Sequence, residues 1–405
     1  MDSFLYCFSF FLALFLFVVM KILQTGDLHL GKLFYERSLI PDQKDMLSQI
    51  VHEIKNGISS GSPYQALLIC GDVYDRSVPP AEAVELFSNF LAELKNASQE
   101  LHIFIISGNH DSANRLSYAA ELLDFQRIHI RTSFENIETP VVVDGTAFYL
   151  FPFCQPSAGR TGEDEADATN AQEAFIAKIA SAARKNCGAE QSVLLAHLFT
   201  AGSVTSESER GVWGTAEQVD SKVFSEFSYT ALGHLHRFQK AGKNVYYAGS
   251  PLAYSFDENS AEKCLLCVEL EPDTEPVVTK IPLTPLHKVV RLSGTFADFY
   301  EGDRFLEFKD DFVEINCQDD TIVENPVLLL KSHFSNLLSF RQEKAIIEET
   351  SSDMAARRDF IFQAKGNIQE HFALFLSDLQ QDGADEEELK LFKKLLDEKE
   401  KDETA

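Results

Sequence analysis

Five short motifs combine Asp, Asn and His residues in a pattern that is typical of metal binding. They read GDLHLG (26–31), GDVYD (71–75), GNHD (108–111), AHLF (196–199) and GHLH (233–236). The potential ligands within them are Asp27, His29, Asp72, Asn109, His197, His234 and His236. Oxygen and imidazole donors without a thiolate suit Mn²⁺, Fe or Zn²⁺. Each motif alone fits a helix cap, a turn or a buried core residue equally well, but the five together favour a metal site.

The number of donors indicates the kind of chemistry. Seven ligands exceed the needs of one ion and suit two ions that share a bridging carboxylate. Two divalent ions about 3.5 to 4 Å apart would clamp the attacking and leaving oxygens of a phosphoryl displacement and activate water near neutral pH. The sequence therefore predicts a two-metal site for phosphoryl chemistry.

Apolar runs precede the motifs and predict the strands that would position them. Runs at 21–27, 65–72 and 100–111 alternate with helical periodicity at 42–56 and 80–95, which predicts a β-α-β-α-β unit. Such a unit builds a mainly parallel, buried sheet that is covered by helices. Further strands are predicted at 147–151, 192–198, 229–234, 244–249 and 263–270. We expect the polar residues to meet at one edge of this sheet, where the carboxyl ends of parallel strands lie.

The periodicity changes near residue 285 and divides the chain into four predicted segments. These are an apolar leader at 1–19, the metal-site domain at 20–285, a small α+β domain at 286–350 and a helical segment at 351–405. Within the third segment, short alternating runs predict strands and the stretch 332–344 predicts a helix. In the last segment, apolar residues such as Phe372, Phe375, Leu389 and Phe392 recur at helical spacing, which indicates a pair of helices.

The first nineteen residues are apolar at sixteen positions, and three interpretations of them compete. A signal peptide is disfavoured because the only charge is Asp2 and no small-residue cleavage site follows. A membrane span fits by length alone, since residues 4–20 reach the lower limit of about 17 residues. The run passes without a linker into the strand that carries the first two ligands. We therefore favour the third interpretation, in which Met20 is the functional initiator and 1–19 lie upstream of the true start.

Composition and charge limit the function classes. The 405 residues include 36 Lys and Arg against 63 Asp and Glu, and the net charge of −27 argues against nucleic-acid binding by the protein surface alone. The sequence contains no GxxxxGK[ST] loop, which excludes nucleotide binding by a P-loop. Its seven cysteines lack the spacing of a disulfide framework, and this pattern is typical of a reducing compartment. We expect a cytoplasmic protein.

Taken in order, the motifs resemble those of the calcineurin-type metallophosphoesterase superfamily, which are D-x-H, G-D-x-x-D, G-N-H-[DE], a single His and G-H-x-H. The longer stretches MKILQTGDLHLGK, GDVYDRSVPP, TALGHLHRFQ and YYAGSPLAYSFDE are similar to the SbcD family of DNA nuclease subunits. The resemblance is specific over residues 20–285 and looser beyond them. It implies an α/β fold, a sandwich of β-sheets flanked by helices, with a small capping α+β domain and a C-terminal helical pair.

The resemblance also implies roles for single residues. One ion would be held by Asp27, His29, Asp72 and His236, and the other by Asp72, Asn109, His197 and His234, with Asp72 as the bridge. His110 would lie near the scissile phosphate, and Asp111 would orient it. Asp75 stands where some relatives have His, so we assign it no role in catalysis. The segment GSPLAYSFDE (249–258) would support the site from behind. The expected cofactors are two divalent metal ions, with Mn²⁺ as the first choice.

The implied function is that of a DNA exonuclease and endonuclease that cleaves ends and hairpins in DNA repair, recombination and replication. The implied partners are DNA and an SbcC-like coiled-coil ATPase, which would bind the helices of 351–405 in a heterotetramer with two copies of this chain. We expect nucleoid association and no stable membrane association. Two alternatives stay open. GDVYDR is similar to the Ser/Thr phosphatases, although GNHD replaces their GNHE, and a mainly structural subunit of the ATPase complex would need no catalysis.

Overall fold

The protein divides into two compact units. The first runs to Arg291 and also includes Glu307–Glu314 and Phe334–Leu338, while Leu292–Leu306, Ile315–His333 and the described residues from Ser339 onward form the second. This computed structural model describes residues 19–154, 171–185, 189–206, 208, 218–259, 261–342 and 389–394. Residues 1–18 of the predicted leader and most of the predicted helical segment 351–405 lie outside the described residues. Among the described helices, none has the length and apolar character needed to cross a membrane.

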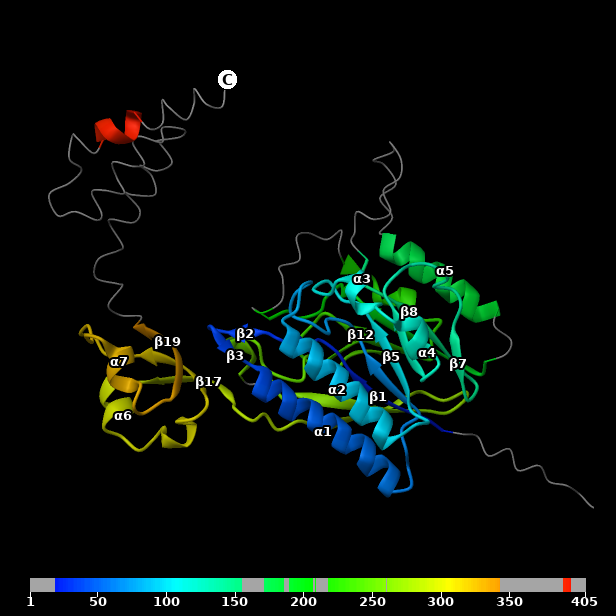
Figure 1. The fold of residues 1–405 in the computed structure, drawn as a ribbon, viewed down its shortest axis with the longest axis horizontal. Helices are drawn as coiled ribbons and strands as arrows, with labels where there is room; N and C mark the ends of the chain where they lie inside the picture. Colours follow the sequence, from blue (N-terminus) through cyan, green and yellow to red (C-terminus); the bar gives the residue numbers. More distant parts are fainter. Residues whose placement is uncertain are drawn as a thin grey trace, which may run out of the picture. The chain divides into compact units, whose positions relative to one another are not determined.

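Two six-stranded sheets dominate the first unit (Figure 1). The first sheet has the order β16 (Val277–Pro282), β15 (Cys264–Leu270), β1 (Met20–Thr25), β4 (Ala66–Ile69), β5 (His102–Ile106) and β6 (Ile128–Arg131). The second has the order β13 (Gln239–Gly242), β14 (Val245–Tyr247), β12 (Tyr229–Gly233), β9 (Gln191–His197), β8 (Thr146–Phe151) and β7 (Val141–Val143). In the first sheet, the strands from β1 to β6 pair in parallel, and β15 and β16 add antiparallel pairs on the other side of β1. In the second sheet, the four central strands pair in parallel and the two edge strands, β13 and β7, pair antiparallel.

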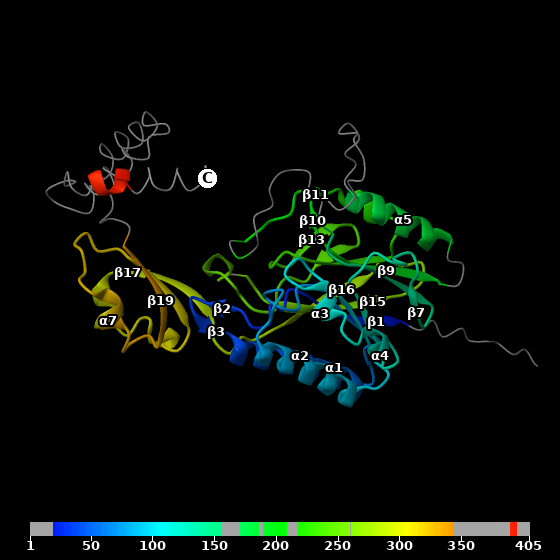
Figure 2. The ribbon, with the colours of Figure 1, turned by 45° about the horizontal axis from the view of Figure 1, so that its top comes forward.

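Helices cover the outer faces of the two sheets. The helices of this unit are α1 (Ile40–Ser59), α2 (Ala81–Ala97), α3 (Ala113–Leu116), α4 (Ala120–Asp124) and α5 (Ala171–Lys185). Figure 2 shows α1 and α2 on one side of the strands and α5 on the opposite side. Along α1, the buried residues Met46, Leu47, Ile50, Val51 and Ile54 recur at three- and four-residue spacing, so that one face of the helix packs on the core. This unit also contains two short strand pairs, β2 (Leu33–Phe34) with β3 (Arg37–Ser38) and β10 (Phe199–Thr200) with β11 (Gln218–Val219).

The central strands are buried on both faces, which explains their unbroken apolar sequence. In β1, Leu23 packs in the core under α1 and α2, while its neighbour Ile22 packs in the core between the two sheets. The rings of Phe104 and Phe148 stack across the sheets with centroids 4.3 Å apart, and such a pair contributes about 0.5–1.5 kcal/mol beyond its buried area. The two sheets therefore pack as one sandwich around a shared apolar layer.

The structure confirms the predicted strands, the two long helices and the sandwich of β-sheets that the resemblance implied, but not the single sheet expected from periodicity. The strands predicted at 21–27, 65–72 and 100–111 are β1, β4 and β5, and the helices predicted at 42–56 and 80–95 are α1 and α2. Periodicity alone predicted one mainly parallel sheet, but the later strands form a second sheet. A strand that is buried on both faces has the same sequence character in either sheet, so the pattern carries no information about its partner.

The second unit contains the helices α6 (Phe296–Tyr300) and α7 (Pro326–Leu330). A three-stranded sheet begins in the first unit and has the order β17 (Val289–Gly294), β18 (Phe312–Cys317) and β19 (Asn336–Gln342). The helix predicted over 332–344 is wrong, because β19 occupies most of this stretch. Its few apolar residues fit a helix and a strand equally well, and pairing in the sheet decides for the strand.

Candidate metal centre

The predicted ligands converge from both sheets. Asp27 and His29 follow β1, Asp72 follows β4 and Asn109 follows β5, all in the first sheet. His197 is the last residue of β9, and His234 and His236 follow β12 in the second sheet. We expected these residues at one edge of a single sheet, but they meet where the carboxyl ends of strands from two sheets lie together. Three groups, Asp27–His29–His236, His29–Asp72–His110 and Asp27–Asp72–His197, each bring their donor atoms within 4.8 Å of one another.

The backbone of the motifs is strained where the ligands stand. Asp27, His29, Asp72 and His234 have φ values of 52°, 44°, 47° and 106°, which residues with a Cβ rarely adopt. Such strain collects at functional sites, where the surrounding structure holds it in place. The glycines of the motifs allow the loops to approach each other. A Cβ added at Gly108 would lie 2.1 Å from Oδ1 of Asp72, so this position requires glycine.

Asp72 lies between two sets of donors. Its Oδ2 is 3.7 Å from Nε2 of His29 and 3.5 Å from Nε2 of His197. On the His197 side, Oδ1 of Asn109 lies 2.9 Å from Nε2 of His197 and 3.1 Å from Nδ1 of His234. On the other side, Nε2 of His29 lies 3.1 Å from Nε2 of His236. One carboxylate oxygen thus faces both sets, as a bridging ligand would.

Burial favours the neutral form of three histidines of the site. It lowers the pKa of His29 well below its ordinary value, lowers that of His197, and lowers that of His234 to about 3, with neighbouring histidines adding to the effect. The Asp72 carboxylate opposes the shift in pKa at His197 and His234 without reversing it. Neutral imidazole is the form that binds metal ions.

The hydrogen bonds of these rings direct lone pairs at one another, and this arrangement fits bound cations. Nδ1 of His197 lies 2.8 Å from the carbonyl oxygen of Cys70 and therefore carries the proton, which leaves Nε2 as an acceptor facing Asn109 and Asp72. On the other side of the site, Nε2 of His29 faces Nε2 of His236 at 3.1 Å, while Nδ1 of His29 lies 3.6 Å from a carboxylate oxygen of Asp75, beyond hydrogen-bond distance. Buried acceptors that face one another need a partner between them, and a bound cation would meet this need.

His110 stands beside the donor groups, and its ring is held by a backbone carbonyl. Nδ1 lies 2.7 Å from the carbonyl oxygen of Asp75 and donates to it, so Nε2 is the nitrogen available to a substrate. The backbone N–H of His110 donates to Oδ1 of Asp72 at 2.8 Å, and its ring meets that of His29 edge to face with centroids 4.7 Å apart. His110 is thereby fixed to the same carboxylate that faces both donor sets.

Asp111 connects two loops through the backbone. Its carboxylate accepts hydrogen bonds from the N–H groups of Val73, Tyr74 and Gly108 at 2.9–3.1 Å. Burial, and next the charge of Asp72, raise the pKa of Asp111 to about 7, although the three backbone hydrogen bonds oppose this. The side chain holds the GDVYD and GNHD loops together, and the orientation of His110 comes from Asp75, a residue to which the motif gave no role.

Sequence reasoning missed the groups behind the ligands. The carbonyls of Cys70 and Asp75 orient His197 and His110, and a backbone carbonyl leaves no signature in a sequence. Nζ of Lys32 lies 2.8 Å from the Asp75 carboxylate and pairs with the same oxygen that lies 3.6 Å from Nδ1 of His29. One signal was available in the sequence. In four motifs a glycine comes directly before the first Asp, Asn or His, and such a glycine marks a place where two loops come into contact.

Comparisons with known proteins point to one family. A family model of the calcineurin-like phosphoesterases matches residues 20–238. Among curated proteins, the D subunit of nuclease SbcCD from Staphylococcus epidermidis (strain ATCC 12228 / FDA PCI 1200) is 31% identical over 325 residues, which cover 79% of this chain and 84% of that protein. Among solved structures, TT1561 of Thermus thermophilus aligns with a TM-score of 0.38 and 14% identity over 65% of this chain and 99% of that chain. The chain belongs to the calcineurin-like phosphoesterase family and, within it, to the SbcD group.

Proposed function

We propose that the chain is the nuclease subunit of an SbcCD-type complex, a metal-dependent exonuclease and endonuclease that hydrolyses phosphodiester bonds at DNA ends and hairpins. The observation that carries this proposal is the position of the Asp72 carboxylate between two sets of potential metal ligands. Support comes from the nuclease name of a relative that is 31% identical. A role in DNA repair, recombination and replication follows from the same relationship.

In this proposal the seven donors hold two divalent ions, for which Mn²⁺ is our first choice. Asp27, His29, Asp72 and His236 would bind one ion, and Asp72, Asn109, His197 and His234 the other. When bound, such ions supply Lewis acidity and lower the pKa of water. The chain itself contributes a preformed, buried set of ligands and the His110 imidazole, whose Nε2 would stabilise the charge on a phosphate oxygen or protonate the leaving oxygen.

Charge explains how an acidic protein would act on DNA. Two divalent ions bring a charge of about +4, and the carboxylates of Asp27 and Asp72 reduce it to about +2, because neutral His and Asn add nothing. The site would therefore attract phosphate although the whole chain has a net charge of −27. An SbcC-like coiled-coil ATPase would supply the extended DNA-binding surface. Its proposed docking segment, 351–405, is described only over the helical residues 389–394.

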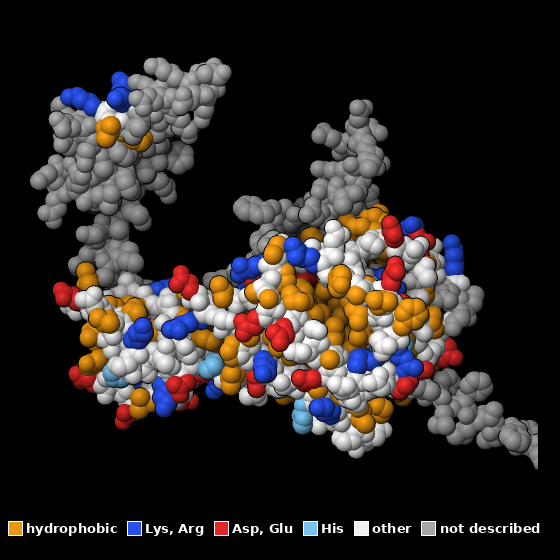
Figure 3. All heavy atoms as spheres, viewed as in Figure 1, with side chains coloured by type: hydrophobic (Ala, Val, Ile, Leu, Met, Phe, Trp, Pro, Cys, Tyr) orange, Lys and Arg blue, Asp and Glu red, His pale blue; other side chains and the backbone are white. Residues whose placement is uncertain are grey.

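An exposed apolar patch supports the proposed homodimer. Tyr118, Leu122 and Phe125 are 83%, 70% and 84% exposed, and they follow the GNHD motif on the segment of α3 and α4. Figure 3 shows hydrophobic side chains gathered on this part of the first unit. Contiguous apolar side chains on a surface mark interaction sites more often than chance exposure does. We propose that a second copy of the chain covers this patch within the heterotetramer.

Charged substitutions in the patch should separate the two copies. We expect Leu122→Glu combined with Phe125→Glu to weaken the dimer about 100-fold or more, which corresponds to about 2.7 kcal/mol, because carboxylates would be buried opposite apolar groups. Sedimentation equilibrium measures the effect. Leu328→Glu on α7, where the leucine is 74% exposed, is the matched control and should leave the association constant unchanged. A dimer of parental strength in the double variant would rule out this patch as the interface.

The substrate class is tested by direct comparison. The full chain with Mn²⁺ is incubated with linear duplex DNA, hairpin DNA and a phosphoserine peptide, with and without its ATPase and ATP. The proposal expects cleavage of the DNA substrates, increased by the ATPase, and at most traces of dephosphorylation. Preferential hydrolysis of the peptide would favour the phosphatase alternative. Hydrolysis of none of these substrates by the metal-loaded complex would favour a structural subunit.

A further inference from the structure

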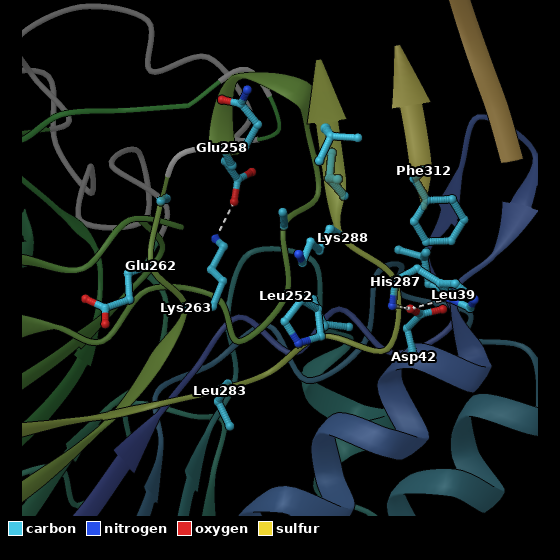
Figure 4. A pocket seen from close by; sticks show the side chains of 16 residues that line it. Leu39, Asp42, Leu252, Glu258, Glu262, Lys263, Leu283, His287, Lys288 and Phe312 are labelled. Atoms are coloured by element: carbon cyan, nitrogen blue, oxygen red, sulfur yellow. Dashed lines mark hydrogen bonds and ion pairs between the residues drawn. The ribbon is translucent and has the colours of Figure 1, made fainter. Parts of the chain in front are cut away.

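A buried ion pair lies directly behind the candidate metal centre. Glu258 ends η4 (Phe256–Glu258) and is 1% exposed, and Lys263 precedes β15 and is 9% exposed. Figure 4 shows the two side chains pointing toward each other at the wall of a cavity of about 250 Å³. A buried ion pair seldom contributes net stability to a fold, so a role other than stability would explain why this pair is present.

The pair contacts His236 from two sides. Nζ of Lys263 donates to the carbonyl oxygen of His236 and to Oγ of Ser250, both at 2.9 Å. Oε1 of Glu258 lies 3.5 Å from Nδ1 of His236, and Oγ of Ser208 lies 2.6 Å from both of these atoms. The pair thus reaches the backbone of His236 directly and its ring through one hydroxyl.

The direction of these hydrogen bonds fixes the proton on the ring. Oε2 of Glu258 accepts a hydrogen bond from the ammonium group of Lys263, and this salt bridge holds the carboxylate in its ionised form. An ionised carboxylate only accepts, so the Ser208 hydroxyl donates to Glu258 and accepts from Nδ1 of His236. The proton is then on Nδ1, and the lone pair is on Nε2, which faces His29 at 3.1 Å.

We propose that Glu258, held by Lys263, is a positioning residue that acts through Ser208 to keep the proton of His236 on Nδ1 and to present its Nε2 lone pair to a metal ion. This inference rests on the proposed function in one respect, namely that His236 is a ligand. A carboxylate behind a ligating histidine is a common way to fix its tautomer and orientation. Here the carboxylate works through a serine and is itself fixed by a lysine that also binds the backbone of the same histidine.

Glu258→Gln is the informative substitution because it reverses the hydrogen bonds while keeping the shape. The cation of Lys263 would take the amide oxygen of the introduced glutamine, so the amide N–H₂ would point at Ser208. The Ser208 hydroxyl would then donate to Nδ1 of His236 and favour the tautomer with its proton on Nε2. We expect Mn²⁺ affinity to fall about 10- to 100-fold, the range for residues behind metal ligands.

The experiment has two readouts, and only one of them involves metal. Isothermal titration of the full, metal-free chain with Mn²⁺ gives the affinity, and ¹⁵N-histidine NMR of the metal-free chain gives the tautomer of His236, assigned by its loss in His236→Gln. Glu262→Gln is the matched control. Glu262 lines the same cavity, but it is exposed and pairs with Lys280. We expect the control to match the parent in both measurements.

Ser208→Ala provides a second test if Glu258→Gln does not fold. It removes the hydroxyl but leaves the ion pair intact. The preference of the His236 ring for a proton on Nδ1 should therefore weaken, and Mn²⁺ affinity should fall, with little loss of thermal stability. Parental Mn²⁺ affinity and an unchanged tautomer in these variants would overturn the inference and leave the proposed function intact. A parent chain that binds no Mn²⁺ would instead contradict the proposed function.

Discussion

Asp72→Asn should abolish phosphodiester hydrolysis, with a loss of at least about 10³-fold in kcat/KM, because both metal ions would lose their shared anionic ligand. The carboxylate oxygen that lies 3.7 Å from His29 and 3.5 Å from His197 becomes part of a neutral amide. The shape of the side chain is kept, and its oxygen can still accept from the N–H of His110. The loss would therefore reflect the missing charge rather than a collapsed loop.

Steady-state hydrolysis of a DNA hairpin and the metal content of the purified variant measure this effect together. We expect fewer than two tightly bound ions per chain. Asp42→Asn is a suitable control because Asp42 is also buried, accepts hydrogen bonds from His287 and lies on α1. This control should keep parental activity and metal content. If Asp72→Asn bound two ions and cleaved DNA nearly as fast as the parent, Asp72 would not be the bridge.

His110→Gln should lower kcat on DNA about 10²- to 10⁴-fold without lowering the metal content, because the side chain would act on the phosphate and not on the ions. His110 Nδ1 is bound to the carbonyl of Asp75, so its Nε2 is the atom lost to the reaction. If this nitrogen protonates the leaving oxygen, the loss should be much smaller with a p-nitrophenyl ester, whose leaving group needs no proton. Comparison of the two substrates in single-turnover experiments separates protonation from charge stabilisation.

The control for His110→Gln is His52→Gln, which makes the same change at an exposed histidine on α1. It should be indistinguishable from the parent on both substrates. A loss of bound metal in His110→Gln would make His110 a ligand, a role that its place in one group with His29 and Asp72 also permits geometrically. Parental cleavage of DNA by the variant would exclude His110 from the reaction altogether.

The strands and the convergence of the site could be predicted because local sequence determines both. Apolar runs that end in Gly and a polar residue predicted β1, β4 and β5, and the order of the motifs predicted that Asp27, Asp72 and Asn109 would meet. The sequence could not predict which sheet each strand joins or which element each strand face packs against. Leu194 and Leu195 are neighbours in β9, yet one packs toward α5 and the other toward the first sheet, and nothing in their identity shows which.

The groups that orient the ligands were also beyond sequence reasoning. The residues that fix His110 and His197 act through backbone carbonyls, which every residue type offers. Glu258 and Ser208 are 50 positions apart, so only the folded chain brings them to His236. The pattern GSPLAYSFDE indicated support from behind the site, but not the atoms involved.

The origin of the ligands in two sheets has a consequence for metal preference. The first sheet supplies all three oxygen donors, Asp27, Asp72 and Asn109, with the single imidazole of His29, whereas the second supplies only imidazoles, His197, His234 and His236. Taken separately, the oxygen donors would select hard cations such as Mg²⁺ and the imidazoles borderline cations such as Zn²⁺. The proposed preference for an ion of intermediate character, such as Mn²⁺, would therefore depend on donors from both sheets and on their packing together.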